Sequence, residues 1–311
     1  MEEIKIFAPA TVANISCGFD VLGCCLDAIG DEMIIRKSEN KGIKITRIEG
    51  VALPLETENN VAGVAGLALL QAYTKPIAFG FEIEMYKKIK PGSGIGSSAA
   101  SAAGTVFGIN ELLDRPFNKT QLVAFAQEGE RLACGAPIAD NVAPALFGGF
   151  TLVKETKPLK IIQLPSLKGL YATIIHPQIE IKTADARAIL PKKIALEDAI
   201  KQWANLGSLI HALHTNDISL FSESLNDYIV EPYRSTLIPD FDKVKESAML
   251  SGALGCGISG SGPSIFTFSE NEKIAKNVAD KIAEVYKKNG IPFHVYISKI
   301  NTNGIKIIHK K

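Results

Sequence analysis

The spacing of apolar residues predicts a chain in which short strands are interleaved with amphipathic helices. Alternating apolar and polar positions are typical of a half-buried strand, whereas apolar residues three or four positions apart indicate one face of a helix. Alternation marks residues 5–8, 31–37, 43–48, 81–89, 170–176, 264–269, 293–300 and 304–309. Helical spacing marks residues 61–73, 120–134, 196–214, 218–226, 241–253 and 272–288, and a further helix that begins at 97. This mixture favours an α+β fold.

A loosened segment divides the chain into two parts. Prolines and a glycine interrupt the pattern between 158 and 169, and both residue types break regular elements. A chain of 311 residues is long enough for two domains of ordinary size. We therefore predict a boundary near Leu164, with one domain over residues 1–164 and a second over 165–311. In the second part, the glycine-rich residues 255–263 are expected to form a loop.

The most informative stretch is residues 91–104, PGSGIGSSAASAAG, where an alternating strand gives way to helical spacing. A glycine loop that leads directly into a helix directs unpaired backbone N–H groups and the positive end of the helix dipole to one point, which suits a phosphate. Ser97 and Ser98 add hydroxyls for a phosphate or Mg²⁺. A flexible turn followed by a serine that caps the helix would explain the same residues. The alanines that follow favour the phosphate site, because they let the helix pack tightly beneath a ligand.

Two well-known phosphate-binding loops do not fit this stretch. A Walker A loop needs a lysine after its second glycine, and this loop has none at that position. Gly94, Gly96 and Ala99 match the dinucleotide fingerprint, but that fingerprint requires a second strand with an acidic residue about 20 positions on. A turn at 114–118 and another helix follow instead. A nicotinamide-dependent oxidoreductase is therefore excluded.

Several polar residues allow both a structural and a functional interpretation. Asn60 precedes the helix at 61–73 and suits a helix cap as well as a nucleotide contact. Glu128 and Glu130 are two positions apart on one helix, so they face different sides, and the spacing does not choose between them.

Two further groups of polar residues lie in loops. Asp140 and Asn141 occupy an apolar loop, where buried polar groups need hydrogen-bond partners. Such a pair often only forms a turn, and a position in a site explains it equally well. Near the start of the chain, Asn14 and Asp20 flank a bend that Gly18 predicts.

Charge and cysteine content narrow the classes of function. The chain has 34 Lys and Arg against 33 Asp and Glu, with no basic block, so we expect no nucleic-acid partner. Its 5 cysteines include no C-x-x-C pair, and an odd number argues against a disulfide framework. The longest apolar stretch, 61–70, is too short to span a membrane, and residues 1–5 do not resemble a signal peptide. We therefore expect a cytoplasmic protein with no membrane partner.

Together these features indicate phosphoryl transfer to a small acceptor. Backbone amides at the helix start would hold phosphates, and a carboxylate with a serine hydroxyl would hold Mg²⁺. Arginines such as Arg187 and Arg234 would hold a carboxylate or phosphate on the acceptor. A lone arginine is more often a surface residue, so these two positions depend on the fold.

The motifs resemble those of the GHMP small-molecule kinases. The loop at 91–103 resembles the second motif of that superfamily. The segments that resemble its homoserine kinase branch in particular are APATVAN at 8–14, GFDVLG at 18–23, DNVAPA at 140–145 with GG at 148–149, and GSGPS at 260–264. They occur in the family's order over nearly the whole chain, which makes the resemblance specific.

The resemblance implies a two-domain α+β fold and a reaction. The N-terminal domain would resemble ribosomal protein S5 domain 2, with a left-handed β-α-β unit, and the C-terminal domain would be ferredoxin-like. The implied reaction is ATP-dependent phosphorylation of L-homoserine to O-phospho-L-homoserine, a step of threonine biosynthesis. ATP would contact Asn60, Pro91, Gly92, Ser93, Gly94, Ile95, Gly96, Ser97, Ser98 and Ala99. The amino acid would contact Asn14, Asp20, Asp140, Asn141, Arg187, Arg234 and Gly260.

The resemblance also assigns catalytic roles to Ser98, Glu130 and Asn141. Ser98 and Glu130 match the positions of the Mg²⁺ ligands in the family. The resemblance therefore favours Glu130 over Glu128. Asp20 would receive the substrate ammonium, and the two arginines its carboxylate. Asn141 lies where other GHMP kinases carry a catalytic aspartate. Because an amide cannot take a proton at neutral pH, we expect direct transfer without a strong protein base.

Other functions stay open on the sequence alone. A different GHMP kinase would act on shikimate or a mevalonate-type substrate, and the branch usually carries a substrate-contacting histidine where this chain has Ile138. A non-catalytic ligand sensor of the same fold is expected to have lost Ser98, Glu130 or the glycine loop, and this chain keeps them. Because this fold often pairs, a homodimer is the expected assembly.

Overall fold

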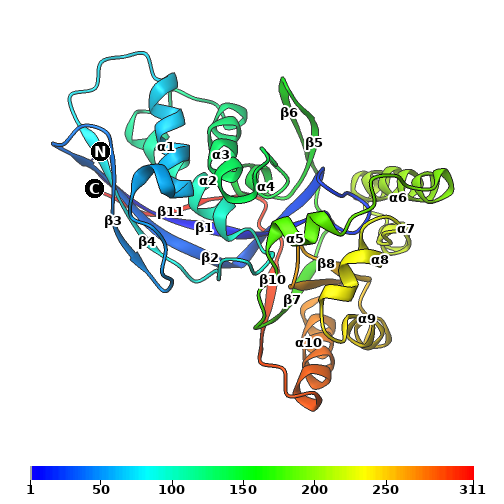
Figure 1. The fold of residues 1–311 in the computed structure, drawn as a ribbon. Helices are drawn as coiled ribbons and strands as arrows, with labels where there is room; N and C mark the ends of the chain where they lie inside the picture. Colours follow the sequence, from blue (N-terminus) through cyan, green and yellow to red (C-terminus); the bar gives the residue numbers. More distant parts are fainter. Residues whose placement is uncertain (1) are drawn as a thin grey trace.

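The computed structural model describes residues 2–311, apart from the side chain of Cys134. Two β-sheets lie next to each other, with helices over one side of the first sheet and around the second (Figure 1). The two ends of the chain meet at the far edge of the first sheet, where Glu2 N donates to Lys311 O at 2.8 Å. Within residues 2–311, no helix combines the length and apolar character that crossing a bilayer requires.

The first sheet contains strands from both ends of the chain. Its members are β1 (Glu3–Ala13), β2 (Leu22–Ser38), β3 (Ile43–Glu49), β4 (Gly80–Tyr86), β5 (Phe150–Thr156), β6 (Leu159–Leu164) and β11 (Lys306–Lys310). The order is β11-β1-β2-β4-β3, with β5 pairing both β2 and β6. β3 and β4 pair in parallel and α1 (Val61–Ala72) connects them, which matches the expected β-α-β unit. The handedness of that unit stays a prediction.

Four helices of the first half pack on this sheet: α1, α2 (Ser97–Leu112), α3 (Lys119–Cys134) and α4 (Val142–Phe147). The short 3₁₀ turn η1 (Thr57–Asn59) precedes α1. The buried, alternate residues Phe81, Ile83 and Met85 of β4 form part of the core beneath the helices. α2 approaches the sheet closely because it is rich in alanine and glycine. A Cβ at Gly104 would already lie 2.4 Å from the sulfur of Met33.

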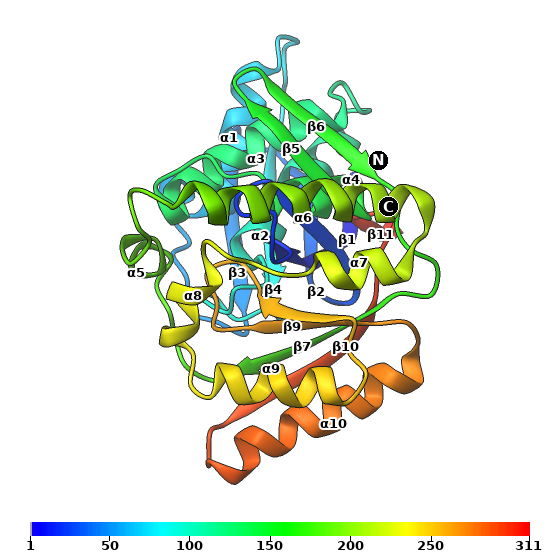
Figure 2. The same ribbon diagram turned by 90° about the vertical axis from the view of Figure 1, so that its right-hand side faces the viewer.

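The second sheet has the ferredoxin-like arrangement that the resemblance implied. Its strands β7 (Tyr171–Pro177), β8 (Gly255–Ile258), β9 (Ile265–Ser269) and β10 (Phe293–Lys299) have the order β10-β7-β9-β8, and all neighbours are antiparallel. Two helices, α9 (Phe241–Leu250) and α10 (Glu272–Lys288), pack together against one face, and α6 (Leu196–Thr215) crosses the molecule on another side (Figure 2). The remaining elements are α5 (Thr183–Ala188), α7 (Ile218–Ser224), α8 (Glu231–Arg234) and η2 (Ser235–Leu237).

Most of the predicted elements are confirmed, and two predictions are wrong. Residues 255–263 are not all loop, because 255–258 form the buried strand β8. Residues 158–168 do not simply loosen the chain, because β6 pairs with β5 there as a hairpin. In addition, β1 and β2 extend well beyond the predicted strands at 5–8 and 31–37.

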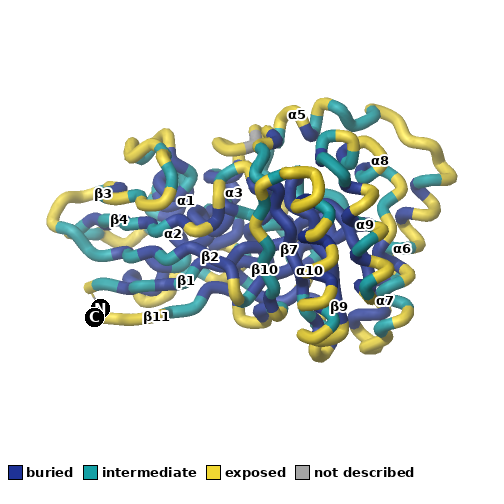
Figure 3. The backbone as a smooth tube through the Cα atoms, turned by 90° about the horizontal axis from the view of Figure 1, so that it is seen from below, coloured by how far each residue is buried: buried dark blue, intermediate teal, exposed yellow. Residues whose placement is uncertain are grey.

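The larger of two apolar core clusters contains residues from both halves of the chain, and the second lies within the C-terminal half around α9 and α10. The rings of Phe150, Phe221 and Phe268 contact one another, although they come from β5, α7 and β9. Buried backbone is continuous through the middle of the molecule (Figure 3). β6 ends at Leu164 in the first sheet and β7 begins the second, but β11 returns to the first sheet. The domain boundary near Leu164 stays a prediction.

Candidate active site

Alternate glycines shape the loop between β4 and α2. Gly92, Gly94 and Gly96 have φ angles of 69°, 82° and 72°, in the left-handed region that glycine adopts without strain. A Cβ at Gly94 would lie 2.5 Å from the carbonyl oxygen of Ser259, and one at Gly96 would lie 2.2 Å from Thr11 Oγ1. Backbone of this kind forms a concavity of amides that binds anions, here at the N-terminus of a long helix.

Contacts from both halves of the chain hold the loop. Thr11 N donates to the carbonyl oxygen of Ile95 at 3.2 Å, and Ser259 Oγ donates to that of Gly94 at 2.8 Å. These contacts order the loop before a ligand binds. The loop therefore loses less conformational entropy when binding occurs.

The two serines at the start of α2 differ in their partners. Ser97 Oγ donates to the carbonyl oxygen of Ile89 at 2.8 Å, so its hydroxyl hydrogen is used within the protein. The backbone N–H of Ser97 remains at the helix start, where no helical carbonyl precedes it. The hydroxyl of Ser98 hydrogen-bonds the carboxylate of Glu130. Ser98 is thus the serine whose hydroxyl lies at a candidate cation site.

Glu130 is a buried carboxylate that lines the same cavity from α3. Burial raises the pKa of Glu130 to about 7, although the hydrogen bond from Ser98 and the positive charge of Lys87 act to lower it. Glu128 lies on the other side of the helix, where it is exposed and pairs with Arg131. The two glutamates therefore face different sides, and Glu130 is the one at the cavity.

A buried ion pair lies against the start of α2, next to the glycine loop. Lys87 Nζ contacts the carboxylate of Asp31 and donates to Ser97 O at 2.9 Å and Ser101 Oγ at 2.8 Å. Asp31 also accepts from the backbone N–H of Ile89 at 2.9 Å. Burial lowers the pKa of Lys87, and the charge of Asp31 opposes that effect. This cation thus contacts the first turn of α2 directly.

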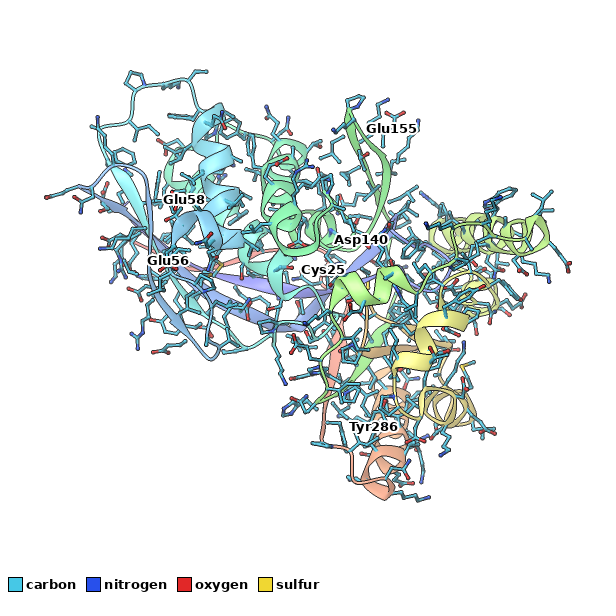
Figure 4. All side chains as sticks on the ribbon, viewed as in Figure 1. Cys25, Glu56, Glu58, Asp140, Glu155 and Tyr286 are labelled. Atoms are coloured by element: carbon cyan, nitrogen blue, oxygen red, sulfur yellow. The ribbon has the colours of Figure 1, made fainter. Side chains whose placement is uncertain are left out.

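Asp140 lies where the two halves of the molecule meet (Figure 4), and both Asp140 and Asn141 line the cavity. Thr11 Oγ1 donates to Asn141 Oδ1 at 2.7 Å, and Asn141 Nδ2 lies 3.4 Å from Asp140 Oδ1. Burial is the main cause that raises the pKa of Asp140 to about 7, and the negative charges of Asp20 and Glu130 add to it. A carboxyl that titrates near neutrality and an oriented amide thus share one corner of the cavity.

An ion pair closes the opposite wall. Arg187 Nη2 donates to both carboxylate oxygens of Asp20, at 3.0 and 2.9 Å. Arg234 is buried nearby and donates through Nη1 to the carbonyl oxygen of Gly260 at 2.8 Å. The ring of Phe19 lies 5.5 Å from the guanidinium carbon of Arg187 and 5.0 Å from that of Arg234. The motif that contains Asp20 therefore also places both arginines.

Asn14 and Asn60 both line the cavity, at two different places. Asn14 Nδ2 donates to Gly260 O at 2.8 Å, and Asn14 Oδ1 accepts from the backbone N–H of Asp20 at 3.1 Å. Asn60 is the N-cap of α1, because its side chain accepts from Ala62 N at 3.0 Å. The structural interpretation of Asn60 is therefore confirmed, and a nucleotide contact stays a prediction.

A single cavity of about 510 Å³ brings the predicted site residues together. Of the residues predicted for ATP, Mg²⁺ and the amino acid, all line it except Ile95 and Ala99. Those two side chains belong to the core, so only their backbone is left for a ligand. The lining includes the apolar residues Leu53, Pro54 and Leu132, the glycine loop, and the charged groups Asp20, Arg187 and Arg234.

Several polar residues at this site were not predicted from the sequence. Thr183 and Ser261 line the cavity and carry hydroxyls, but single hydroxyl residues in loops give no signal. Lys87 and Asp31 did give one, because each falls in the apolar phase of a predicted alternating strand, 81–89 and 31–37. In the structure Asp31 lies on β2, Lys87 directly follows β4, and both are buried. A charge at such a position requires a partner, and the antiparallel pairing of β2 with β4 brings the two together.

Comparisons with known proteins agree with this geometry. The family model for the N-terminal domain of GHMP kinases matches residues 42–149, and the model for their C-terminal region matches residues 209–288. A homoserine kinase of Chlorobium phaeobacteroides (strain BS1) is 42% identical over 320 aligned positions, which cover 99% of this chain and 100% of that protein.

Solved structures extend the match to three dimensions. The crystal structure of homoserine kinase from Cytophaga hutchinsonii has a TM-score of 0.95 at 50% identity, covering 99% of this chain and 98% of that one. The mevalonate kinase of L. major, solved with R-mevalonate, shares the fold alone, with a TM-score of 0.69 at 14% identity over 95% of this chain and 96% of that one. The protein described here is thus a member of the homoserine kinase family within the GHMP kinases.

Proposed function

We propose that this chain transfers the γ-phosphoryl group of ATP to the hydroxyl of L-homoserine, giving O-phospho-L-homoserine, a step of threonine biosynthesis. One observation carries the proposal. A glycine loop at the start of α2 and an ion pair between Asp20 and Arg187 line one cavity of about 510 Å³. The loop suits a phosphate tail, and the ion pair suits the ammonium and carboxylate of an amino acid.

The phosphate end of the cavity suits a nucleotide. Amides of residues 94–98 face the anion at the helix start, and Lys87 adds a positive charge directly behind it. Next to Asn60, the wall includes Leu53, Pro54 and Leu132, an apolar surface of the kind that holds a base. We therefore assign the purine to this end and the γ-phosphate to the end near Asn141.

Ser98 and Glu130 fit Mg²⁺. The cation prefers oxygen ligands, and sites of this kind use one or two protein oxygens with substrate phosphates completing the shell. The carboxylate of Glu130 is buried, which makes its negative charge unfavourable without a cation and raises its pKa to about 7. When bound, the metal would neutralise charge that develops on the transferred phosphoryl group.

The acceptor end of the cavity suits a zwitterion. Arg187 and Asp20 form an ion pair with each other, and an amino acid offers the same two charges. The substrate ammonium would replace Arg187 at Asp20, and the carboxylate would replace Asp20 at Arg187. Arg234 donates to Gly260 O beside this pair and adds a second guanidinium for the carboxylate.

Asn141 would orient the substrate hydroxyl without taking its proton. In this proposal the hydroxyl oxygen forms a bond to the γ-phosphorus, the bond between that phosphorus and the β,γ-bridging oxygen breaks, and the hydroxyl proton passes to an oxygen of the transferred group. A loose transition state tolerates the absence of a strong base. Positioning and charge neutralisation then supply most of the rate.

The function is tested by measuring ADP release with L-homoserine, L-threonine, L-serine, shikimate and mevalonate, and by following the product with ³¹P NMR. We expect L-homoserine to have the highest kcat/KM, by at least about tenfold over the other amino acids. Preference for shikimate or mevalonate would make the chain a different GHMP kinase. Nucleotide binding with turnover of none of the five would make it a ligand sensor.

The charge assignment at the acceptor end is tested with Arg187→Met. Loss of the guanidinium that would hold the substrate carboxylate should raise the KM for L-homoserine by about tenfold or more, with a smaller change in kcat. 3-Aminopropan-1-ol is the matched control, because it is homoserine without the carboxylate. The variant should use this amine as well as the wild type does. An equal loss with both acceptors would contradict the assignment.

A homodimer would bury the outer face of α6. Leu196, Ile200 and Trp203 are 67%, 54% and 60% exposed and follow one another at helical spacing on an otherwise polar surface. A second copy of the same helix is the partner that fits such a self-complementary apolar stripe. Trp203→Glu should convert the dimer to a monomer in light-scattering chromatography. Leu250→Glu, an exposed residue of α9, is the control that should not.

A further inference from the structure

Thr11 contacts the two parts of the site that must act together. It lies on β1, is completely buried and does not line the cavity. Its hydroxyl donates to Asn141 Oδ1 at 2.7 Å, and its backbone N–H donates to Ile95 O of the glycine loop at 3.2 Å. Thr11 and Asn141 are 130 positions apart in the chain, so the folded protein builds this contact.

The neighbours of Asn141 determine which end of its amide points where. The oxygen and nitrogen of an asparagine side chain occupy nearly the same shape, so hydrogen-bond partners decide the orientation. Asp140 Oδ1 lies 3.4 Å from the nitrogen end, and a carboxylate attracts N–H and repels a carbonyl oxygen. At the other end, a Cβ at Gly96 would lie 3.0 Å from Asn141 Oδ1. The carbonyl oxygen of the amide therefore faces the glycine loop.

We propose that Thr11 is a positioning residue for phosphoryl transfer, whose hydroxyl holds the carbonyl oxygen of Asn141 against the glycine loop. An amide oxygen has two acceptor positions. Thr11 occupies one. The other accepts a hydrogen bond from the acceptor hydroxyl before transfer, which turns a lone pair of that hydroxyl toward the γ-phosphorus. The proton stays on the hydroxyl oxygen until the new bond to phosphorus forms and then passes to an oxygen of the transferred group. This inference rests on the proposed kinase function and names the residue that maintains its geometry.

Loss of the Thr11 hydroxyl should affect the rate of transfer and not substrate binding, because other residues bind the substrate. Asp20, Arg187 and Arg234 bind the charged groups of the amino acid, and none of them contacts Thr11 in this way. Without the Thr11 hydroxyl, only the longer contact of Asn141 Nδ2 with Asp140 Oδ1, at 3.4 Å, still orients the amide, so its carbonyl oxygen is held less firmly toward the acceptor hydroxyl. The loss therefore falls on kcat and leaves KM nearly unchanged.

The test compares Thr11→Val with Thr11→Ser. Valine keeps the shape of threonine and removes the hydroxyl, whereas serine keeps the hydroxyl and removes a methyl group. Thr11→Val should lower kcat by about tenfold with both KM values within about twofold, the size expected for one neutral hydrogen bond. Thr11→Ser should return kcat to within about twofold. Equal kcat in wild type and Thr11→Val, or equal losses in the two variants, would overturn the proposal.

A second comparison shows whether Thr11 acts through Asn141. In an Asn141→Ala background, replacing Thr11 by valine should have no further effect on kcat, because the amide that it orients is gone. Independent losses that multiply in the double variant would mean that Thr11 acts by another route. If the wild type prefers another acceptor of the panel, the same comparison is made with that acceptor, and only the substrate assignment fails.

A readout without turnover separates this inference from the kinase function itself. In ¹⁵N-labelled protein, the side-chain NH₂ signals of Asn141 are identified by their absence in Asn141→Asp. They should keep their positions in Thr11→Ser and should shift or double in Thr11→Val. Unchanged signals in Thr11→Val would overturn the proposal even if L-homoserine is the substrate. Failure of the whole acceptor panel would overturn the function and leave this measurement valid.

Discussion

Glu130 is a carboxyl group that the fold keeps from water, and its pKa of about 7 lies above the ordinary value of 4.5. The folded protein therefore binds this proton more tightly than the unfolded chain does. Because stability rises with pH only where the unfolded state binds more protons, the free energy of unfolding must fall as pH rises from about 4.5 to about 7. The full penalty, about 3 kcal/mol, persists above pH 7. A bound cation at this site removes it.

Glu130→Gln should therefore stabilise the ligand-free protein at high pH. We expect the variant to gain up to about 3 kcal/mol over wild type at pH 8 and nothing at pH 4.5. Urea unfolding at both pH values measures this difference. Glu128→Gln, on the exposed side of α3, is the control and should change neither value. Parallel pH dependences in wild type and Glu130→Gln would contradict the assignment of the raised pKa to Glu130.

Asp140 tests whether the reaction proceeds without a strong base. Its pKa of about 7 and its contact with Asn141 make it the carboxylate best placed to accept a proton near the acceptor hydroxyl. If transfer needs no base, Asp140→Asn should lower kcat by less than about tenfold, and kcat should keep the pH dependence of the wild type. Measuring kcat at saturating substrate from pH 5.5 to 8.5 shows whether Asp140 acts as the base. A loss of about 100-fold or more, together with loss of an acidic limb near pH 7, would identify Asp140 as the base.

At the scale of single residues, site residues that belong to a recognisable motif could be predicted from the sequence. Contacts between residues of distant segments could not. Asn14, Asp20 and Asn141 belong to recognisable segments, and all line the cavity. The partner of Asn141 could not be predicted, because Thr11 and Asn141 come from distant segments. Lys87 could have been suspected, because a lysine at a core-facing strand position needs a buried partner.

At the scale of elements, the glycine loop between β4 and α2 depends on another loop packed against it. Gly94 has a positive φ of 82°, and a Cβ there would meet the backbone oxygen of Ser259 at 2.5 Å. That oxygen belongs to the segment after β8, so the two loops approach too closely for any side chain. A substitution at Gly94 must move one of them.

Gly94→Ala should accordingly cost about 3 kcal/mol of stability and abolish nucleotide binding, because both the backbone conformation and the loop contact are lost. Gly290 provides a matched control. It also has a positive φ, of 66°, but a Cβ there would meet nothing within 4 Å. Gly290→Ala should cost about 1 kcal/mol and leave nucleotide affinity unchanged. Thermal unfolding and calorimetric titration measure both. Equal effects of the two substitutions would contradict the role of the loop contact.

Three of the elements that were not predicted, β8, β6 and α4, have a weak local pattern. β8 has the sequence GCGI, and glycine-rich residues do not indicate a strand. Its four residues are nevertheless buried and pair with β9, so tertiary contacts form it. β6 has an exposed, irregular pattern next to prolines. α4 has six residues with Pro144 in its middle, too short and too interrupted to show a helical period.

At the scale of the whole molecule, residues on both sides of Leu164 share the larger apolar core cluster, and the first sheet takes β11 from the end of the chain. The aromatic cluster of Phe150, Phe221 and Phe268 joins the two parts, and the cavity takes residues from both. The fold class followed from motifs in family order. The return of β11 to the first sheet could not follow from local pattern, because strand pairing between chain ends depends on the complete topology.

The last strand of the chain pairs with the first strand. β11 pairs with β1 along Ile4, Ile6 and their neighbours, and Lys311 adds backbone bonds to Glu2 and Glu3. Deleting residues 304–311 removes these bonds and leaves the backbone of β1 unpaired at the edge of the sheet. It also removes the close contact of Gly304 with α4. Because β1 also carries residues of the site, the deletion acts on both stability and function.

We therefore expect the 1–303 truncation to unfold at a midpoint at least about 10 °C lower than the intact chain, a shift of several kcal/mol for a protein of this size, and to lose kinase activity. Lys306→Met is the control, because it removes the ion pair with Asp27 and keeps the strand. An exposed pair of this kind contributes at most about 1 kcal/mol, so the control should unfold within about 3 °C of wild type. Calorimetry of the intact chain should show one transition. Two separate transitions, with the truncation affecting only one, would mean that the halves fold independently.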